Sequence, residues 1–68
     1  MYQNLKIELA KKDITNRKVA AILNIHENTV AYKVNGDGSF SVEEAFILKE
    51  ELFPNLDLKY LFKRTVAS

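Results

Sequence analysis

The sequence predicts an all-α fold, a compact bundle of about five short helices. Apolar residues recur at intervals of three and four along most of the 68 residues, which is the period of an amphipathic helix. Residue types that begin and end helices separate these stretches, and alternating β-branched runs are too few to indicate a sheet. The length gives room for a single domain, residues 1–68, with an ordered core at about residues 3–62 and a loose tail from Lys63.

The first helix is expected over about residues 4–12. Tyr2, Leu5 and Leu9 fall at helical spacing before it closes in the polar run at residues 11–13. These three residues are expected to face the core.

A second helix of about two turns is expected after Thr15, a residue type that caps helix starts because its hydroxyl accepts from a free backbone N–H. Val19, Ala20 and Leu23 then repeat at helical spacing. Asn24 follows and tolerates the left-handed backbone conformation, so a sharp turn is expected there.

The third helix is expected over about residues 27–34. Val30 and Val34 lie one turn apart and form a narrow apolar stripe, so most of this helix should face outward. Gly36 and its neighbours supply the backbone freedom for the reversal that follows.

Ser41 and Glu44 predict a capping box at the start of a fourth helix, because each side chain can satisfy a backbone N–H of the other's residue. Pro54 predicts its end. Asp57 is expected to cap a short last helix at residues 58–62. The inward face of the fourth helix is expected to consist of Val42, Ala45, Leu48 and Leu52.

The charge is unevenly distributed although the net charge is only +1. Residues 1–36 carry six lysines and arginines against three acids, a balance of +3, and residues 37–68 carry four against six, a balance of −2. Such a split suits a protein with one face toward phosphates, and ordinary solvated helix surfaces produce it as well.

Residues 16–36 carry the features of a helix-turn-helix in the required order. The first helix of that motif needs a small residue at the helix crossing, here Ala20, and a turn residue, here Asn24. An apolar residue must follow, and Ile25 does; Val30 and Val34 then anchor the second helix.

Through residues 14–30 the chain resembles the lambda-repressor-like family, the Cro and XRE type of phage and bacterial regulators. The resemblance extends over roughly residues 4–62, and the Phe-Pro-Asn-Leu close at residues 53–56 resembles short phage-encoded members. Asn24 stands where the family usually has glycine, and His26 stands where it usually has serine or threonine.

The resemblance implies the residues that contact DNA. Family members read bases with the exposed start of the second helix of the motif, and they hold phosphates at the start of its first helix and just after the second. Asparagine can pair with adenine, and glutamate can accept from cytosine. The base-reading candidates are Glu27, Asn28, Ala31 and Tyr32, and the phosphate candidates are Asn16, Arg17, Lys33 and Asn35. Lys18 and Thr29 are further candidates for DNA contact, and His26 could place a ring N–H on a phosphate.

Several of these residues have structural alternatives. Glu27 can simply favour its helix N-terminus electrostatically, and Tyr32 can be a half-buried packing residue. Arg17 and Lys18 can be ordinary solvated charges.

Catalysis and metal binding are not expected. The chain has one histidine, no cysteine and carboxylates that pair only along helix surfaces, so no enzyme activity, metal site or cofactor is predicted. No apolar run approaches the length of a membrane span, and the first residues lack a signal-peptide layout, so a cytoplasmic location is expected.

Two functions remain open. The first is a sequence-specific DNA-binding regulator, a repressor or Cro-like switch protein, that binds a double-stranded operator as a homodimer. Surplus apolar residues offer a dimer interface, although a well-filled core would also explain them: Ile22, Phe46, Ile47 and Tyr60. The alternative is an antirepressor that presents Glu27, Tyr32 and these apolar residues to a partner repressor protein instead of DNA.

Overall fold

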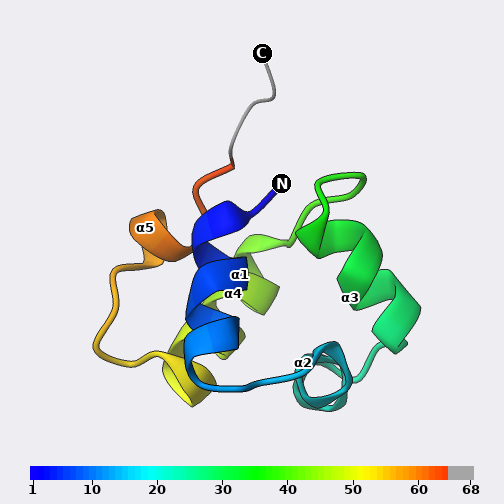
Figure 1. The fold of residues 1–68 in the computed structure, drawn as a ribbon, viewed down its shortest axis with the longest axis horizontal. Helices are drawn as coiled ribbons and strands as arrows, with labels where there is room; N and C mark the ends of the chain where they lie inside the picture. The colour runs from blue at the N-terminus through cyan, green and yellow to red at the C-terminus, as the bar shows by residue number, and fades with distance from the viewer. Residues whose placement is uncertain (65–68) are drawn as a thin grey trace.

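A computed structural model describes residues 1–64 of the chain. The described part forms five helices: α1 (Gln3–Lys11), α2 (Asn16–Leu23), α3 (Glu27–Val34), α4 (Val42–Leu52) and α5 (Leu58–Leu61) (Figure 1). No strand occurs among residues 1–64, so the predicted all-α class is confirmed. Within the same residues, every helix is too short and too polar to reach across a bilayer.

The helices surround one core to which each contributes. In Figure 1, α1 and α4 lie at the centre, α2 and α3 lie to one side, and α5 lies to the other. α2 packs against α3 and α4, while α5 packs against α1 and α4. The largest fully buried side chains are Leu5, Val19, Val30, Leu48, Phe53 and Leu61.

The predicted helix starts are confirmed at three positions. The Thr15 hydroxyl accepts a hydrogen bond from the Lys18 N–H at 3.2 Å. Ser41 and Glu44 form the predicted capping box, with distances of 3.0 and 2.9 Å. The Asp57 carboxylate accepts from the Tyr60 N–H at 3.2 Å. α5 ends at Leu61, one residue earlier than expected.

Val42 lies outside the core, contrary to the prediction. Its side chain is 71% exposed, whereas Ala45 and Leu48 of the same helix are buried. The spacing of Val42 matches that of the inward-facing residues of α4. However, Val42 is the first residue of the helix and borders a surface groove, where no neighbouring element covers it.

The segment after α5, where the sequence predicts the start of a loose tail, contacts the rest of the molecule at Arg64. The Arg64 guanidinium donates a hydrogen bond to the Gly36 carbonyl at 2.7 Å and lies over the Tyr2 ring, 5.3 Å from its centroid. Gly36 itself has a φ of 92°, as expected for the reversal after α3. The remainder of the predicted loose tail, residues 65–68, lies outside the described residues.

Candidate nucleic-acid interface

α2 and α3 are joined by a turn of three residues, Asn24, Ile25 and His26. Asn24 has φ 57° and ψ 45°, the left-handed conformation expected from its residue type. The Ile25 N–H donates to the Ala20 carbonyl at 3.1 Å and closes the end of α2. The Ile25 side chain packs against the core, so the turn is fixed from both sides.

His26 caps the start of α3. Its Nδ1 accepts a hydrogen bond from the Asn28 N–H at 3.1 Å, a role that serine or threonine fills at most helix starts. A neutral imidazole that accepts at Nδ1 carries its proton on Nε2. The exposed His26 ring therefore has one N–H donor left over after capping the helix.

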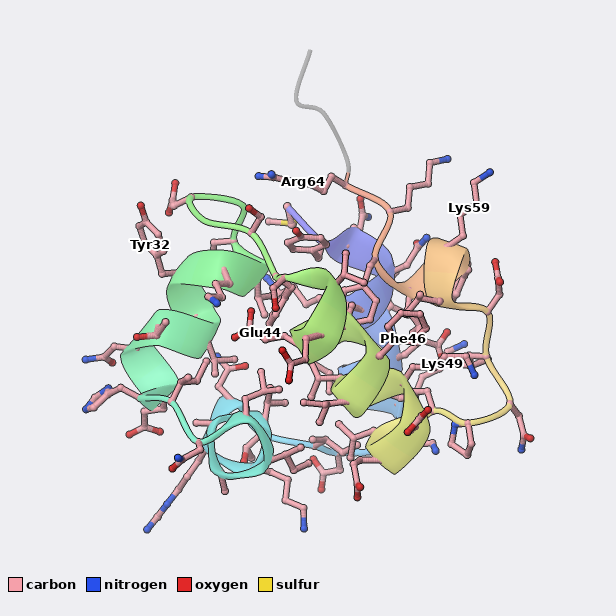
Figure 2. The ribbon with its side chains drawn as sticks, turned by 180° about the vertical axis from the view of Figure 1, so that it is seen from behind. Tyr32, Glu44, Phe46, Lys49, Lys59 and Arg64 are labelled. Atoms are coloured by element: carbon pink, nitrogen blue, oxygen red, sulfur yellow. The ribbon has the colours of Figure 1, made fainter. Side chains whose placement is uncertain are left out.

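α3 is held along one side only. Val30 and Val34 are its buried residues, as predicted, and the Val34 carbonyl accepts from the Tyr2 N–H at 3.0 Å. The opposite surface, which we call the outer face of α3, carries the exposed residues Asn28 and Tyr32, one turn apart. Glu27 is exposed as the first residue of α3, on the same stripe as the two valines. Figure 2 shows the Tyr32 side chain projecting from α3 at the edge of the molecule.

Most of the residues predicted to contact DNA lie on the surface. Thr29, Ala31 and Lys33 are half-buried. The exposed ones are Asn16, Arg17, Lys18, His26, Glu27, Asn28, Tyr32 and Asn35.

Tyr32 combines exposure with packing. Its side chain is 54% exposed, and its ring lies so close to Gly38 that a Cβ there would meet a ring carbon at 2.7 Å. The ring is therefore supported on one side by the loop after α3 and open on the other.

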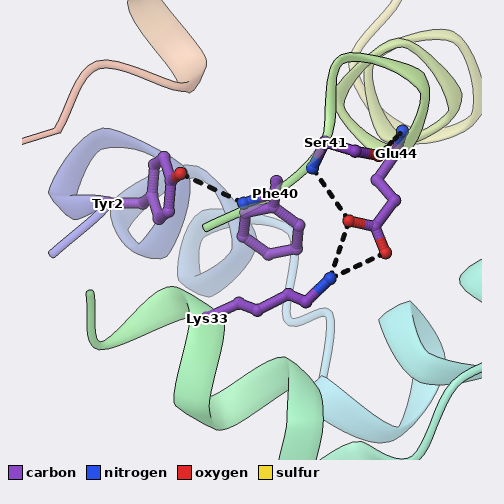
Figure 3. A network of polar contacts seen from close by, with 5 residues as sticks. All are labelled: Tyr2, Lys33, Phe40, Ser41 and Glu44. Carbon is purple, nitrogen blue, oxygen red and sulfur yellow. Dashed lines mark hydrogen bonds and ion pairs between the residues drawn. The ribbon is translucent and has the colours of Figure 1, made fainter. Parts of the chain in front are cut away.

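Lys33 is engaged with α4 rather than free for a phosphate (Figure 3). Its ammonium lies 2.7 and 2.9 Å from the two carboxylate oxygens of Glu44. Burial alone would raise the pKa of Glu44, but hydrogen bonds from Lys33 and the Ser41 N–H, with the lysine charge, lower it. This ion pair ties the last turn of α3 to the first turn of α4.

A small cleft brings the start of α2 beside the flank of α3. It has a volume of about 250 Å³, and its lining includes Asn16 of α2, Ala31 of α3 and Asn35, which directly follows α3. Three predicted residues are thus neighbours. Ala31 faces this cleft beside Asn16, so its methyl lies at the flank of α3 and not on the outer face.

Lys6 of α1 lines the same cleft and was not predicted. It is exposed and has no carboxylate within salt-bridge distance among residues 1–64, which also holds for Arg17 and Lys18. No local sequence pattern indicates Lys6, because only the packing of α1 against α3 brings it to the cleft. Three unpaired cations therefore lie around the start of α2, and Glu27 is the exposed acid of α3.

The residues predicted for a dimer interface lie in different surroundings. Phe46 is 48% exposed on the outside of α4, as Figure 2 shows, and Ile47 is half-buried. The Tyr60 hydroxyl lies 2.8 Å from a Glu8 carboxylate oxygen, and this hydrogen bond raises the pKa of Tyr60. Ile22 packs against the core.

No family model, curated protein or solved structure matches the chain. The arrangement of α2 and α3 is therefore the main indication of function.

Proposed function

We propose that the chain is a sequence-specific DNA-binding regulator in which α2 and α3 act as a helix-turn-helix. One observation carries the proposal: α3 is anchored through Val30 and Val34, while its outer face projects beside the basic start of α2. This is the arrangement that a helix needs if its side chains are to reach base edges. The resemblance of residues 14–30 to Cro and XRE regulators supports the same function.

The outer face of α3 suits the major groove. An α-helix with its side chains is about 10–12 Å in diameter, and the major groove of B-DNA is about 12 Å wide. Asn28 has the amide that can pair with both adenine N6 and N7, and Glu27 can accept from the amino group of cytosine. Tyr32 adds an aromatic surface one turn further along α3.

Phosphate contacts are assigned to Arg17, Lys18 and Lys6. These unpaired cations lie around the start of α2, and the Nε2 donor of His26 extends the set toward α3. Contacts of this kind fix the position of the protein on the duplex, while base contacts decide which sequence it prefers. Lys33 is left out because Glu44 already occupies its ammonium.

The proposed regulator acts as a homodimer. Two copies related by twofold symmetry would place their α3 helices in successive major grooves, about 34 Å apart. Phe46 is the best supported of the predicted interface residues, because it is apolar and exposed.

A second candidate, an antirepressor that binds a partner repressor instead of DNA, is favoured by one observation. Glu27 is exposed at the first position of α3, where it would approach phosphates, and the net charge of the chain is only +1. In this function Glu27 and Tyr32 would contact a basic surface of the partner protein.

A salt series on duplex DNA separates the two candidates. If each protomer of the homodimer contacts three or four phosphates, the slope of log K against log salt should be about −5 to −7, near −0.9 for each phosphate. The association constant should be measured by fluorescence anisotropy on duplexes obtained by selection from random sequences. Failure to enrich any duplex, together with a flat salt response, would favour the antirepressor.

Two substitutions test the assigned roles within the DNA-binding function. Arg17→Ala should weaken binding to all duplexes alike and make the salt slope of the homodimer shallower by about 2, one phosphate for each protomer, whereas Asn28→Ala should relax base preference at one position in each half-site. The matched controls are Lys59→Ala and Asn55→Ala, which alter exposed residues of α5 and of the α4–α5 loop. Unchanged base preference for Asn28→Ala would reject its assignment as a base reader.

A further inference from the structure

A second surface feature, which we call the C-terminal groove, lies between the first turn of α4, α5 and the segment after α5. It has a volume of about 600 Å³ and is predominantly apolar. None of the residues assigned to DNA contact lines it. Its apolar lining consists of Tyr2, Phe40, Val42, Ala45, Leu58 and Phe62.

Three aromatic rings form a rigid part of the groove. Tyr2, Phe40 and Phe62 pack edge to face, with centroid distances of 5.1, 6.0 and 5.6 Å. The Tyr2 hydroxyl also accepts from the Phe40 N–H at 3.1 Å (Figure 3). Because these contacts exist within the chain, the groove is formed before any ligand enters it, which lowers the entropic cost of binding.

The rim of the groove is basic. Lys59, Lys63 and Arg64 are exposed on the α5 side, where Figure 2 shows Lys59 pointing outward, while the Arg64 guanidinium lies over the Tyr2 ring of the groove. Lys59 and Lys63 have no carboxylate within salt-bridge distance among residues 1–64. Opposite them, the Val42 side chain is 71% exposed and offers apolar surface without a partner.

We propose that the C-terminal groove binds an acidic peptide segment of another protein that inserts apolar anchors. The apolar lining takes side chains such as Leu or Phe at helical spacing, and the three cations pair with Asp or Glu beside those anchors. Nucleic acid satisfies only the cations and leaves the apolar lining uncovered. The inference does not depend on the proposed DNA-binding function.

A second copy of the chain fits the groove less well. The exposed apolar residues of α4 are Val42 and Phe46, and Val42 already forms part of the groove wall. The α4 of a second copy therefore has only Phe46 free as an anchor, although it does carry the acids Glu43 and Glu50.

The test uses the full chain and a fluorescein-labelled helical peptide with Leu or Phe at positions i, i+4 and i+7 and Glu between them. Anisotropy should show saturable binding that weakens with salt, and NMR shift changes should cluster at Val42, Leu58 and Phe62. A control peptide with Lys in place of each Glu, and another with Ser in place of each anchor, should each bind at least about tenfold more weakly. Equal binding of either control would overturn the proposal.

Variants of the protein locate the site. Lys59→Glu combined with Lys63→Glu, and separately Val42→Ser, should each weaken peptide binding about tenfold or more, with thermal unfolding close to that of the parent. Arg17→Glu and Ile7→Ser are the matched controls on other surfaces. Arg17→Glu should lower duplex binding and leave peptide binding intact, so failure of one function does not imply failure of the other.

Self-association is measured in the same samples. If groove resonances of the chain alone shift with concentration and sedimentation shows a dimer that the peptide dissociates, the occupant is a second copy and the proposal is overturned. Groove resonances that do not change with protein concentration and shift only when the peptide is added support it, and dimerisation through Phe46, outside the groove, is compatible with that result.

Discussion

The α2–α3 side and the α4–α5 side of the molecule share one core but present opposite surfaces. On the α2–α3 side, Val30 and Val34 are buried and the outer face of α3 is polar and aromatic. On the α4–α5 side, Val42 and Phe46 are exposed, and an apolar groove with a basic rim lies between α4 and α5.

The comparison shows where a small domain places the apolar residues that its core does not need. A chain of this length buries only about 60% of the surface that its unfolded form exposes, so each helix needs only a few core residues. α3 supplies two and leaves the rest polar, whereas α4 supplies Ala45 and Leu48 and still exposes apolar surface. Polar exposure suits a highly charged partner, and apolar exposure suits a protein partner.

The largest expected effect on stability comes from comparing a buried and an exposed residue of α4. Leu48→Ala should lower the free energy of unfolding by about 3 kcal/mol, because Leu48 is fully buried and its removal leaves a cavity. Phe46→Ala should cost less than about 1 kcal/mol, because half of its ring is already in water. Urea denaturation measures the free energy of unfolding of both variants. Comparable losses would mean that the outside of α4 is not a free surface.

On the α2–α3 side, substitutions at Asn24 test whether the turn requires the left-handed backbone conformation. Asn24→Ala should destabilise the fold by about 1 kcal/mol, because alanine resists the left-handed conformation, while Asn24→Gly should be nearly neutral. Asn35→Ala is the control, since Asn35 is exposed and right-handed, with a φ of −72°. Thermal unfolding distinguishes them. An equal loss in the Asn24→Ala and Asn35→Ala variants would contradict a special backbone requirement at the turn.

The Lys33–Glu44 ion pair, which links the two sides, predicts that the stability of the fold falls at acid pH. The pKa of Glu44 is lowered in the folded state from an ordinary value of 4.5. The pair therefore stabilises the fold above pH 4.5, and this stability is lost as the pH falls through the lowered pKa. Glu44→Gln should remove a contribution of about 1 kcal/mol at pH 7 and flatten the curve below pH 4.5.

Chemical denaturation from pH 7 to 3 measures the effect, with Glu43→Gln as the control on the exposed side of the same turn. A parallel pH curve for the Glu44→Gln variant would show that the ion pair adds nothing.

Val42→Ser should have the smallest effect on stability. At 71% exposure the residue loses little on truncation, so the free energy of unfolding should change by about 0.5 kcal/mol or less. A loss above about 1 kcal/mol in urea denaturation would place Val42 in the core, as the sequence pattern suggested.

Features set by neighbouring residues were predictable from the sequence. The caps at Thr15, Ser41 and Asp57, and the left-handed Asn24, each depend on chemistry within a few residues. The burial of Val30 and Val34 followed from helical spacing alone.

Features that join distant residues were not predictable. The position of Lys6 beside Asn16, the Lys33–Glu44 pair and the anchoring of Arg64 on Gly36 all require the packed helices. The groove brings together residues 2, 40 and 62, which no sequence pattern connects. At Val42 the sequence predicted a contact that the structure lacks. Helical spacing shows which residues share a face, but it does not show whether another element covers that face.

The shortness of the α2–α3 connection has a consequence for how this molecule can vary. Each residue of an α-helix advances about 100° around its axis, and three residues leave no slack to absorb that rotation. One residue inserted within α3 between Asn28 and Val30 would rotate Asn28 by about 100° relative to the buried valines, and one inserted in the turn would displace the start of α3 from α2. Diversity at this surface is therefore confined to exchanges of side chains on a backbone of constant length.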